Sequence, residues 1–228
     1  MAYTKVEIRE KLENFLQNNS LESLYKEDLI NYIGTTTDTT EYYTEVISEF
    51  LLEKITEDFN PFDNIESITR ETGYKIDSHY VENLKVLENN RKEENFAKKL
   101  FKNNATLKGL GKILGFQVPL KNVQKDKAGK IDLISFNVNE NSAYLIELKV
   151  DGNKETLLRT VLEIVTYFQK LNHQKFLESF DEFKNNTVIK KAVLLTEGCK
   201  AREELQDLDS RPRLKKLIEK LNIEFFLL

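Results

Sequence analysis

Two acidic residues and a lysine interrupt apolar runs of the sequence. Asp132 lies within residues 130–136 (KIDLISF), and Glu147 and Lys149 lie within residues 143–150 (AYLIELKV). A carboxylate or an ammonium buried in such a run costs several kcal/mol unless it is paired or binds a metal ion. The pattern therefore predicts a cation-binding catalytic site. If the two runs form a surface hairpin instead, the charges are ordinary exposed ones.

Both runs have the composition of β-strands. They are rich in Ile, Leu, Phe, Tyr and Val, and residues 137–142 between them are typical of a turn. Side chains alternate between the faces of a strand, so Glu147 and Lys149 are expected on one face with Ala143 and Leu145.

The elements expected around these strands follow a characteristic order. An amphipathic helix carrying Glu93 and Glu94 precedes them, followed by a strand ending at residues 118–120. A long helix over residues 155–171, a strand over 188–196, a helix near 211–221 and a strand over 223–227 come after them. This helix, three strands, helix and strand resembles the core of the PD-(D/E)XK nuclease superfamily over residues 93–228. The resemblance implies an α/β fold with a restriction-endonuclease-like core (αβββαβ, a central mixed sheet flanked by helices).

The resemblance assigns roles residue by residue. Asp132 matches the first metal-binding acid, although Ile131 stands where the motif has proline, and Glu147 and Lys149 match the second acid and the lysine. The carboxylates and the Leu148 backbone carbonyl are then expected to hold Mg²⁺ or Mn²⁺, hard cations that take oxygen ligands. Lys149 is expected to orient the attacking water and to stabilise developing negative charge.

A third acid is expected from the preceding helix. Glu93 heads an apolar stripe through Phe96, Ala97 and Leu100, which favours its side chain pointing toward the core. Glu94 aligns with Ala97 nearly as well and stays a second candidate.

The helix over residues 155–171 carries a polar ridge of Arg159, Glu163 and Tyr167, spaced by four residues. RecB-like members of the superfamily have Gln-x-x-x-Tyr at this place, and Glu163-x-x-x-Tyr167 is similar. The ridge is either a solvated face or the nucleic-acid-binding wall of the cleft, with Arg159 and Tyr167 touching the substrate.

Charge divides the chain into two parts. Residues 1–90 contain 8 Lys+Arg and 19 Asp+Glu, a net of −11, whereas residues 91–228 contain 26 and 19, a net of +7. We expect an acidic helical region over residues 1–75 and a nuclease-like domain over 76–228, with the basic part binding DNA or, alternatively, RNA. The acidic region is expected to mediate a homodimer or to contact a partner protein, and a helix-turn-helix DNA reader is the competing idea.

The acidic region is predicted to be helical. Helices are expected over residues 5–16 and 21–33, and Asp38-Thr-Thr-Glu41 is typical of a capping box before a helix with apolar residues at 46–55. A further helix is expected to begin after Ser78 and to run into the Glu93 helix.

Composition excludes several classes of protein. A single cysteine rules out an intramolecular disulfide and a cysteine-cluster zinc site, and two histidines weaken histidine-based mechanisms. The absence of an 18-residue apolar run favours a cytoplasmic protein that does not enter membranes. The leading hypothesis is a metal-dependent nuclease of the restriction, repair or defence type, acting inside DNA or at its ends. The alternative is a non-catalytic nucleic-acid-binding or scaffolding member of the same fold.

Overall fold

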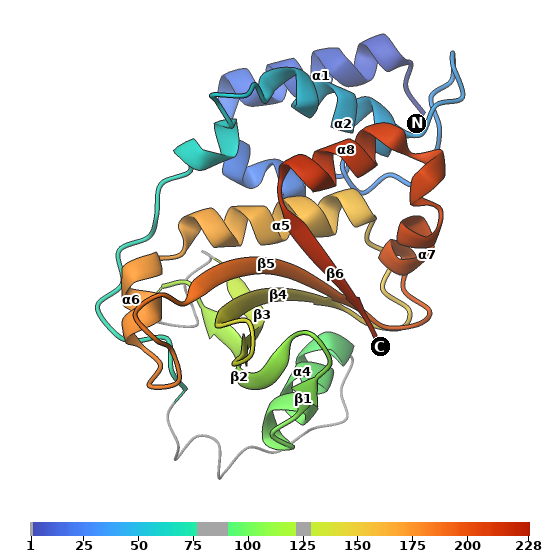
Figure 1. Ribbon diagram of the computed structural model, residues 1–228. Helices are drawn as coiled ribbons and strands as arrows, with labels where there is room; N and C mark the ends of the chain where they lie inside the picture. Colours follow the sequence, from blue (N-terminus) through green and yellow to red (C-terminus); the bar gives the residue numbers. More distant parts are fainter. Residues whose placement is uncertain (1, 77–90, 122–128) are drawn as a thin grey trace.

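A mixed six-stranded sheet forms the centre of the computed structural model, which describes residues 2–76, 91–121 and 129–228. The strands lie in the order of the sequence, and the sheet is curled (Figure 1). The pairs β1–β2, β2–β3 and β3–β4 are antiparallel, whereas β4–β5 and β5–β6 are parallel. The strands are β1 (Thr106–Leu107), β2 (Gly111–Pro119), β3 (Lys130–Asn137), β4 (Ser142–Lys149), β5 (Val188–Leu195) and β6 (Ile223–Leu227). The chain is therefore an α/β protein, as predicted.

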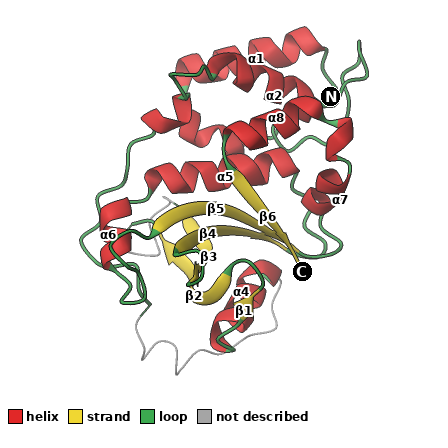
Figure 2. Ribbon diagram, in the orientation of Figure 1, coloured by secondary structure: helices red, strands yellow, loops and turns green. Residues whose placement is uncertain are grey.

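Helices cover both faces of this sheet. Helix α5 crosses one face, and α4 lies against the other (Figures 1 and 2). The helices and 3₁₀ turns are α1 (Lys5–Asn18), η1 (Leu21–Lys26), α2 (Tyr43–Lys54), η2 (Pro61–Asn64), α4 (Lys92–Lys102), α5 (Leu157–Lys170), α6 (His173–Glu178), α7 (Lys200–Gln206), η3 (Leu208–Ser210) and α8 (Pro212–Lys220).

Each face of the sheet has its own apolar core. On the α5 side, Ala143 and Leu145 of β4 join Val161 and Leu158 of α5 in one buried cluster. On the α4 side, Tyr144, Ile146 and Leu148 join Ala97 in the other. Every residue of β4 is buried, because this strand is central and covered on both sides. Charged residues on β4 therefore have no direct route to bulk solvent.

The N-terminal helices pack on the helices of the C-terminal part. Helices α1, α2 and α8 lie side by side above α5 in Figure 1, α2 contacts α8, and η1 contacts α5. Ile8, Leu24 and Phe50 belong to the same buried cluster as the α5 face of the sheet. The predicted division into residues 1–75 and 76–228 stays a prediction about domains, but the apolar core is continuous across it.

Two predictions about the N-terminal region are wrong. Residues 21–33 form only the short 3₁₀ turn η1 followed by turns, because this segment is pinned by contacts with α5. The capping box lies at Thr4 and Glu7, where it begins α1. Asp38 accepts the Lys5 N–H at 3.1 Å at the start of α1, and the N-cap residue of α2 is Tyr42, without a side-chain cap.

One predicted helix cannot be compared with the structure, and three observed elements were absent from the prediction. The helix predicted after Ser78 falls largely outside the described residues, and α6, α7 and β1 were not predicted.

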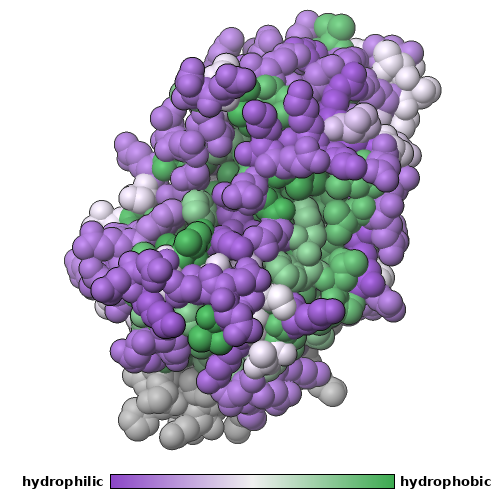
Figure 3. Space-filling view, viewed as in Figure 1, coloured by the Kyte–Doolittle hydropathy of each residue, from purple (hydrophilic) through white to green (hydrophobic). Residues whose placement is uncertain are grey.

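In the part of the chain that is described, no helix is both long and apolar enough to span a bilayer. The visible surface is mostly hydrophilic, with apolar side chains gathered near β6 and below α8 (Figure 3), where Leu227 and Leu228 are exposed.

Candidate active site

Asp132 lies between two neighbouring strands that both carry polar residues of the site. Phe116 pairs with Leu133 across β2 and β3, and Leu133 pairs with Ile146 across β3 and β4. Extending these registers places Asp132 opposite Gln117 on one side and Glu147 on the other. The Gln117 side-chain amide donates to Asp132 Oδ1 at 2.6 Å, and the Leu148 N–H donates to Asp132 Oδ2 at 3.0 Å.

Gln117 has a backbone conformation that non-glycine residues rarely adopt. Its φ is +46°, in the left-handed region, although it stands inside β2. Such a residue in a strand changes the direction of its side chain, and strained backbone is often found at functional sites. Here the side chain reaches Asp132.

Glu147 and Lys149 share the face of β4 that is covered by α5, as the alternation of the strand predicts. Both are only 3 % exposed. Lys149 Nζ forms ion pairs with three carboxylates: it lies 2.7 Å from Glu147 Oε1, 2.5 Å from Glu155 Oε2 and 3.5 Å from Glu163 Oε2. We call Glu147, Glu155 and Glu163 the lysine cage.

Helix α5 positions the part of the cage that does not come from β4. Its N-cap residue, Thr156, accepts the Arg159 N–H at 3.2 Å, and Glu155 directly precedes it. One turn after Arg159, Glu163 faces Lys149 and accepts a hydrogen bond from the Tyr167 hydroxyl at 2.9 Å. Glu155 also pairs with Arg159 Nε at 2.9 Å. The predicted polar ridge of α5 is therefore turned toward the sheet.

Tyr167 is packed inside the protein. It is 6 % exposed, and its hydroxyl lies 3.4 Å from that of Tyr25 in η1. Gly129 passes so close to its ring that a Cβ there would lie 2.5 Å from a ring carbon. In this arrangement Tyr167 supports Glu163 and offers no surface for stacking on a nucleic acid, and Arg159 is engaged by Glu155.

A cleft of about 540 Å³ opens beside Asp132. Glu93 and Asp132 both line it, whereas Glu147 and Lys149 are not among its lining residues. The other residues that line the cleft are Arg91, Lys92, Glu94, Gln117, Val150, Asp151, Gly152 and Asn153.

The two candidate acids of α4 differ in their contacts. Glu93 Oε1 accepts a hydrogen bond from the Asn153 side chain at 2.7 Å, and its charge acts on both Asp132 and Lys149. Glu94 pairs with Arg91 at 3.2 Å and approaches Lys98 at 4.0 Å, both on its own helix or next to it. Glu93 is therefore the acid that belongs to the site.

Five carboxylates form one electrostatically linked group, which we call the acidic cluster: Glu93, Asp132, Glu147, Glu155 and Glu163. Burial raises the pKa of Asp132 to about 7, although the Lys149 charge and the Leu148 N–H act in the opposite direction. Burial and the charges of Asp132 and Glu163 raise the pKa of Glu147 well above its usual range. The cluster therefore holds more negative charge than its buried surroundings favour.

The cations of the cluster do not balance it. Burial alone would lower the pKa of Lys149, but Glu147, Glu163 and Glu155 together raise it well above the usual value. The Lys149 charge lowers the pKa of Glu155 against the effect of burial. Lys149 pairs with three of the five carboxylates and Arg159 with Glu155, so these two cations leave an excess of negative charge when all five carboxyl groups are ionised.

Sequence reasoning missed four residues of this site. Gln117 holds Asp132, Asn153 holds Glu93, Glu155 completes the cage, and Tyr25 backs Tyr167. Glu155 could have been found, because an acid just before the N-cap of α5 falls close to the end of β4. Gln117 and Tyr25 gave no signal in the sequence, since only the fold brings them near the other residues.

The oxygen atoms of the cluster suit a hard divalent cation. Among the described residues, no three side chains of His, Cys, Asp or Glu converge as a ready metal-binding group. Mg²⁺ keeps several waters and commonly uses one or two carboxylates, so Asp132 and Glu147 suffice in number. Comparison of the chain with protein-family models, with curated proteins and with solved structures found no match in any of the three.

Proposed function

We propose that this protein is a metal-dependent nuclease that hydrolyses phosphodiester bonds. DNA is the first candidate substrate, and RNA is the second. The observation that carries the proposal is the excess of buried carboxylate around Asp132 and Glu147, at the edge of a cleft. A cation bound there would stabilise both carboxylates in their ionised forms. The sequence pattern Asp132…Glu147-Leu148-Lys149 on consecutive strands supports the assignment to the PD-(D/E)XK superfamily, and so does the observed element order from α4 to β5.

The proposed ligands are the carboxylates of Asp132 and Glu147, the Leu148 carbonyl that the family resemblance implies, and Glu93 directly or through water. A bound Mg²⁺ would lower the pKa of a coordinated water and polarise the phosphate. Lys149 contributes positive charge next to Glu147, since its ammonium lies 2.7 Å from Glu147 Oε1. Gln117 and Asn153 hold the carboxylates of Asp132 and Glu93 in place.

The cleft carries charges of both signs. Arg91 and Lys92 line it beside Glu93, Glu94, Asp132 and Asp151, and residues 91–228 as a whole carry a net charge of +7. Contacts of Arg and Lys side chains with phosphates supply affinity that does not depend on the nucleotide sequence and that falls steeply with salt. These features support a nucleic acid as the substrate, in the proposed restriction, repair or defence role.

A second candidate is a non-catalytic nucleic-acid-binding or scaffolding protein. One observation favours it: Lys149 already forms ion pairs with three carboxylates and does not line the cleft. In that case the charged residues form a structural ion cluster.

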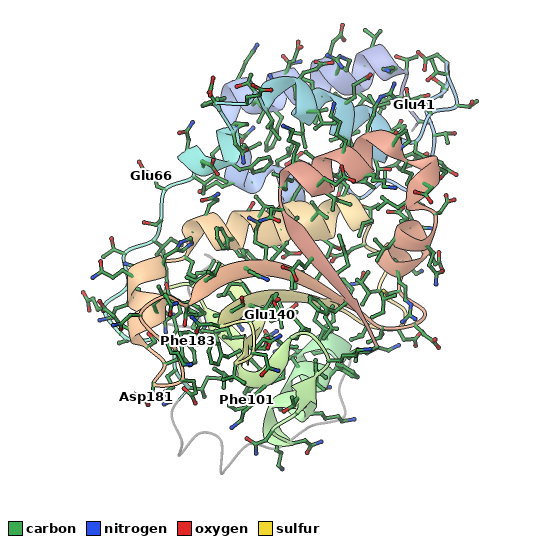
Figure 4. The ribbon with its side chains drawn as sticks, in the orientation of Figure 1. Glu41, Glu66, Phe101, Glu140, Asp181 and Phe183 are labelled. Carbon is green, nitrogen blue, oxygen red and sulfur yellow. The ribbon has the colours of Figure 1, made fainter. Side chains whose placement is uncertain are left out.

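Cleavage assays distinguish the two candidates. Pure protein is incubated with linear, circular and single-stranded DNA and with RNA, with Mg²⁺, with Mn²⁺ and with chelator. We expect metal-dependent cleavage that falls at least about a hundredfold in Asp132→Asn and Glu147→Gln, because each removes one charged ligand. Glu140→Gln is the matched control, since Glu140 lies in the turn after β3 (Figure 4) and pairs with Lys190 at 3.1 Å, outside the cluster. Cleavage by Glu147→Gln at the wild-type rate would contradict the proposal.

A further inference from the structure

The N-terminal region touches α5 at two places that flank the lysine cage. The first is at the start of the helix. The Thr156 N–H donates to Asn31 Oδ1 at 2.9 Å, and the Thr156 hydroxyl donates to the Ile30 carbonyl at 2.8 Å. Thr156 directly follows Glu155, so these contacts fix the backbone from which the Glu155 side chain reaches Lys149.

The second contact lies about three turns further along α5. The Tyr167 hydroxyl donates to Glu163, which leaves it able to accept a hydrogen bond from the Tyr25 hydroxyl at 3.4 Å. The rings of Tyr25 and Tyr167 meet edge to face, with centroids 5.9 Å apart. Tyr25 is buried, and the charges of Glu163 and Glu147 help to raise its pKa after the larger effect of burial. It is therefore close to the cage as well as to Tyr167.

The three carboxylates of the cage thus have different supports. Glu147 stands on β4, the central strand of the sheet, and its position depends on that strand. Glu155 directly precedes the N-cap residue of α5, and Glu163 lies in the first half of that helix. Asn31 supports Glu155 indirectly, and Tyr25 supports Glu163 indirectly. When Glu147 takes part in binding a cation, the Lys149 ammonium depends on Glu155 and Glu163 for its position.

We propose that the N-terminal region is a working part of the active site, in which Asn31 and Tyr25 position Lys149 through Glu155 and Glu163. Asn31 acts through Thr156, and Tyr25 acts through Tyr167. Both are positioning residues, because neither touches Lys149. The catalytic consequence rests on the proposed nuclease function, whereas the positioning itself can be measured in the metal-free protein.

The test uses the full chain with Tyr25→Phe, Asn31→Ala and the double variant. Tyr25→Phe removes only the hydroxyl, and Asn31→Ala removes the acceptor for the Thr156 N–H. Glu22→Gln is the matched control, because Glu22 also joins η1 to α5, through an ion pair with Lys170 at 3.2 Å, but does not contact the cage. Asn31→Asp keeps an acceptor oxygen and should restore the wild-type behaviour.

The first measurement is the ¹⁵N spectrum of lysine ammonium groups in the metal-free protein, with the Lys149 signal assigned by its loss in Lys149→Arg. A buried ammonium held by three carboxylates exchanges its protons slowly, so wild type and Glu22→Gln should show a sharp signal. We expect the signal to broaden or disappear in the double variant and to weaken in each single variant. An unchanged Lys149 signal in a folded double variant would overturn the inference. If the double variant does not fold, the two single variants decide the question in the same way.

The second measurement is the rate of DNA cleavage. We expect kcat to fall about tenfold in the double variant with KM unchanged, which is the pattern of a lost positioning contact. A rise of KM at constant kcat would instead place Asn31 and Tyr25 in substrate binding and overturn the proposed role. If wild type cleaves no nucleic acid with any metal, the nuclease proposal fails, while the ammonium spectrum still decides whether the N-terminal region positions Lys149.

Discussion

The two sides of the acidic cluster hold their carboxylates by different means. On the cleft side, Asp132 and Glu93 are held by the neutral amides of Gln117 and Asn153. On the cage side, Glu147, Glu155 and Glu163 surround the ammonium of Lys149, which is 3 % exposed. The cage therefore has a cation in ion-pair contact with its carboxylates, whereas Arg91 and Lys92 at the cleft pair with Glu94 and Asp151. An added cation should consequently bind on the cleft side and draw Glu147 into its coordination.

The largest expected effect is on the cage. Lys149→Met removes the cation from three carboxylates that are mostly buried, and removing one partner of a buried ion pair costs about 3–5 kcal/mol. We expect the free energy of unfolding at pH 8, measured by urea denaturation, to fall by that amount without added metal.

Asp132→Asn is the matching variant on the cleft side. It removes a negative charge from an already over-negative cluster and keeps an oxygen that can accept the Leu148 N–H, so stability at pH 8 should stay the same or rise. Equal destabilisation by both variants would show that the two sides do not differ as described.

Metal should stabilise the protein, and more so at high pH. At a Mg²⁺ concentration about 100 times Kd, binding to the folded state alone adds about 2.7 kcal/mol to the free energy of unfolding. Because Asp132 must be ionised to bind and its pKa is raised to about 7, the effect should be clear at pH 8 and weak at pH 6. Thermal unfolding at both pH values measures this, and equal stabilisation of Asp132→Asn would contradict it.

Without metal, the free energy of unfolding should fall as the pH rises. Asp132 has a pKa of about 7 in the folded protein and about 3.9 in an unfolded chain. Its protonated form therefore favours folding at low pH, and that contribution is lost as the pH rises through 7. We expect the metal-free protein to lose about 2 kcal/mol between pH 5 and pH 8, less than the full linkage value because Asp132 borders an open cleft. A flat stability profile for wild type, or an unchanged slope in Asp132→Asn, would argue against the raised pKa.

The smallest effect separates the two acids of α4. Glu93→Gln removes a charge that acts on Asp132 and Lys149, so we expect metal affinity to fall about tenfold. Glu94→Gln breaks only contacts with Arg91 and Lys98 and should leave the affinity within a factor of two. Calorimetric titration with Mn²⁺ compares them, and the reverse order would assign the site to Glu94.

Most elements of the C-terminal part, although not β1, α6 and α7, could be predicted from the sequence because their signals are local. Strong apolar periodicity marks α5 and α8, and the two apolar runs with their turn give the β3–β4 hairpin, with boundaries within about two residues. The shared face of Glu147 and Lys149 follows from strand alternation alone. The N-terminal region was predicted less well, because the segment after η1 is held by contacts with α5 instead of by its own helical pattern.

The chemistry of the site depends on contacts between distant parts of the chain. The pairing of Lys149 with Glu155 and Glu163 requires the crossing of α5 over β4, and Tyr25 and Tyr167 are 142 positions apart in the sequence. A helical ridge of Arg159, Glu163 and Tyr167 is equally consistent with a solvated face, a substrate wall or an interior support. The direction in which α5 packs decides between them, and helical spacing carries no information about that direction.

The most direct test of the central claim is Mn²⁺ binding at pH 8, measured by electron paramagnetic resonance on the wild-type protein, Asp132→Asn and Glu147→Gln. We expect at least one bound Mn²⁺ per wild-type chain and an affinity at least about a hundredfold lower in each variant, because the two carboxylates share the cation. Glu140→Gln should bind as wild type does. Binding of equal strength in Glu147→Gln, or no binding by the wild-type protein at millimolar Mn²⁺, would contradict the claim that Asp132 and Glu147 form a metal site.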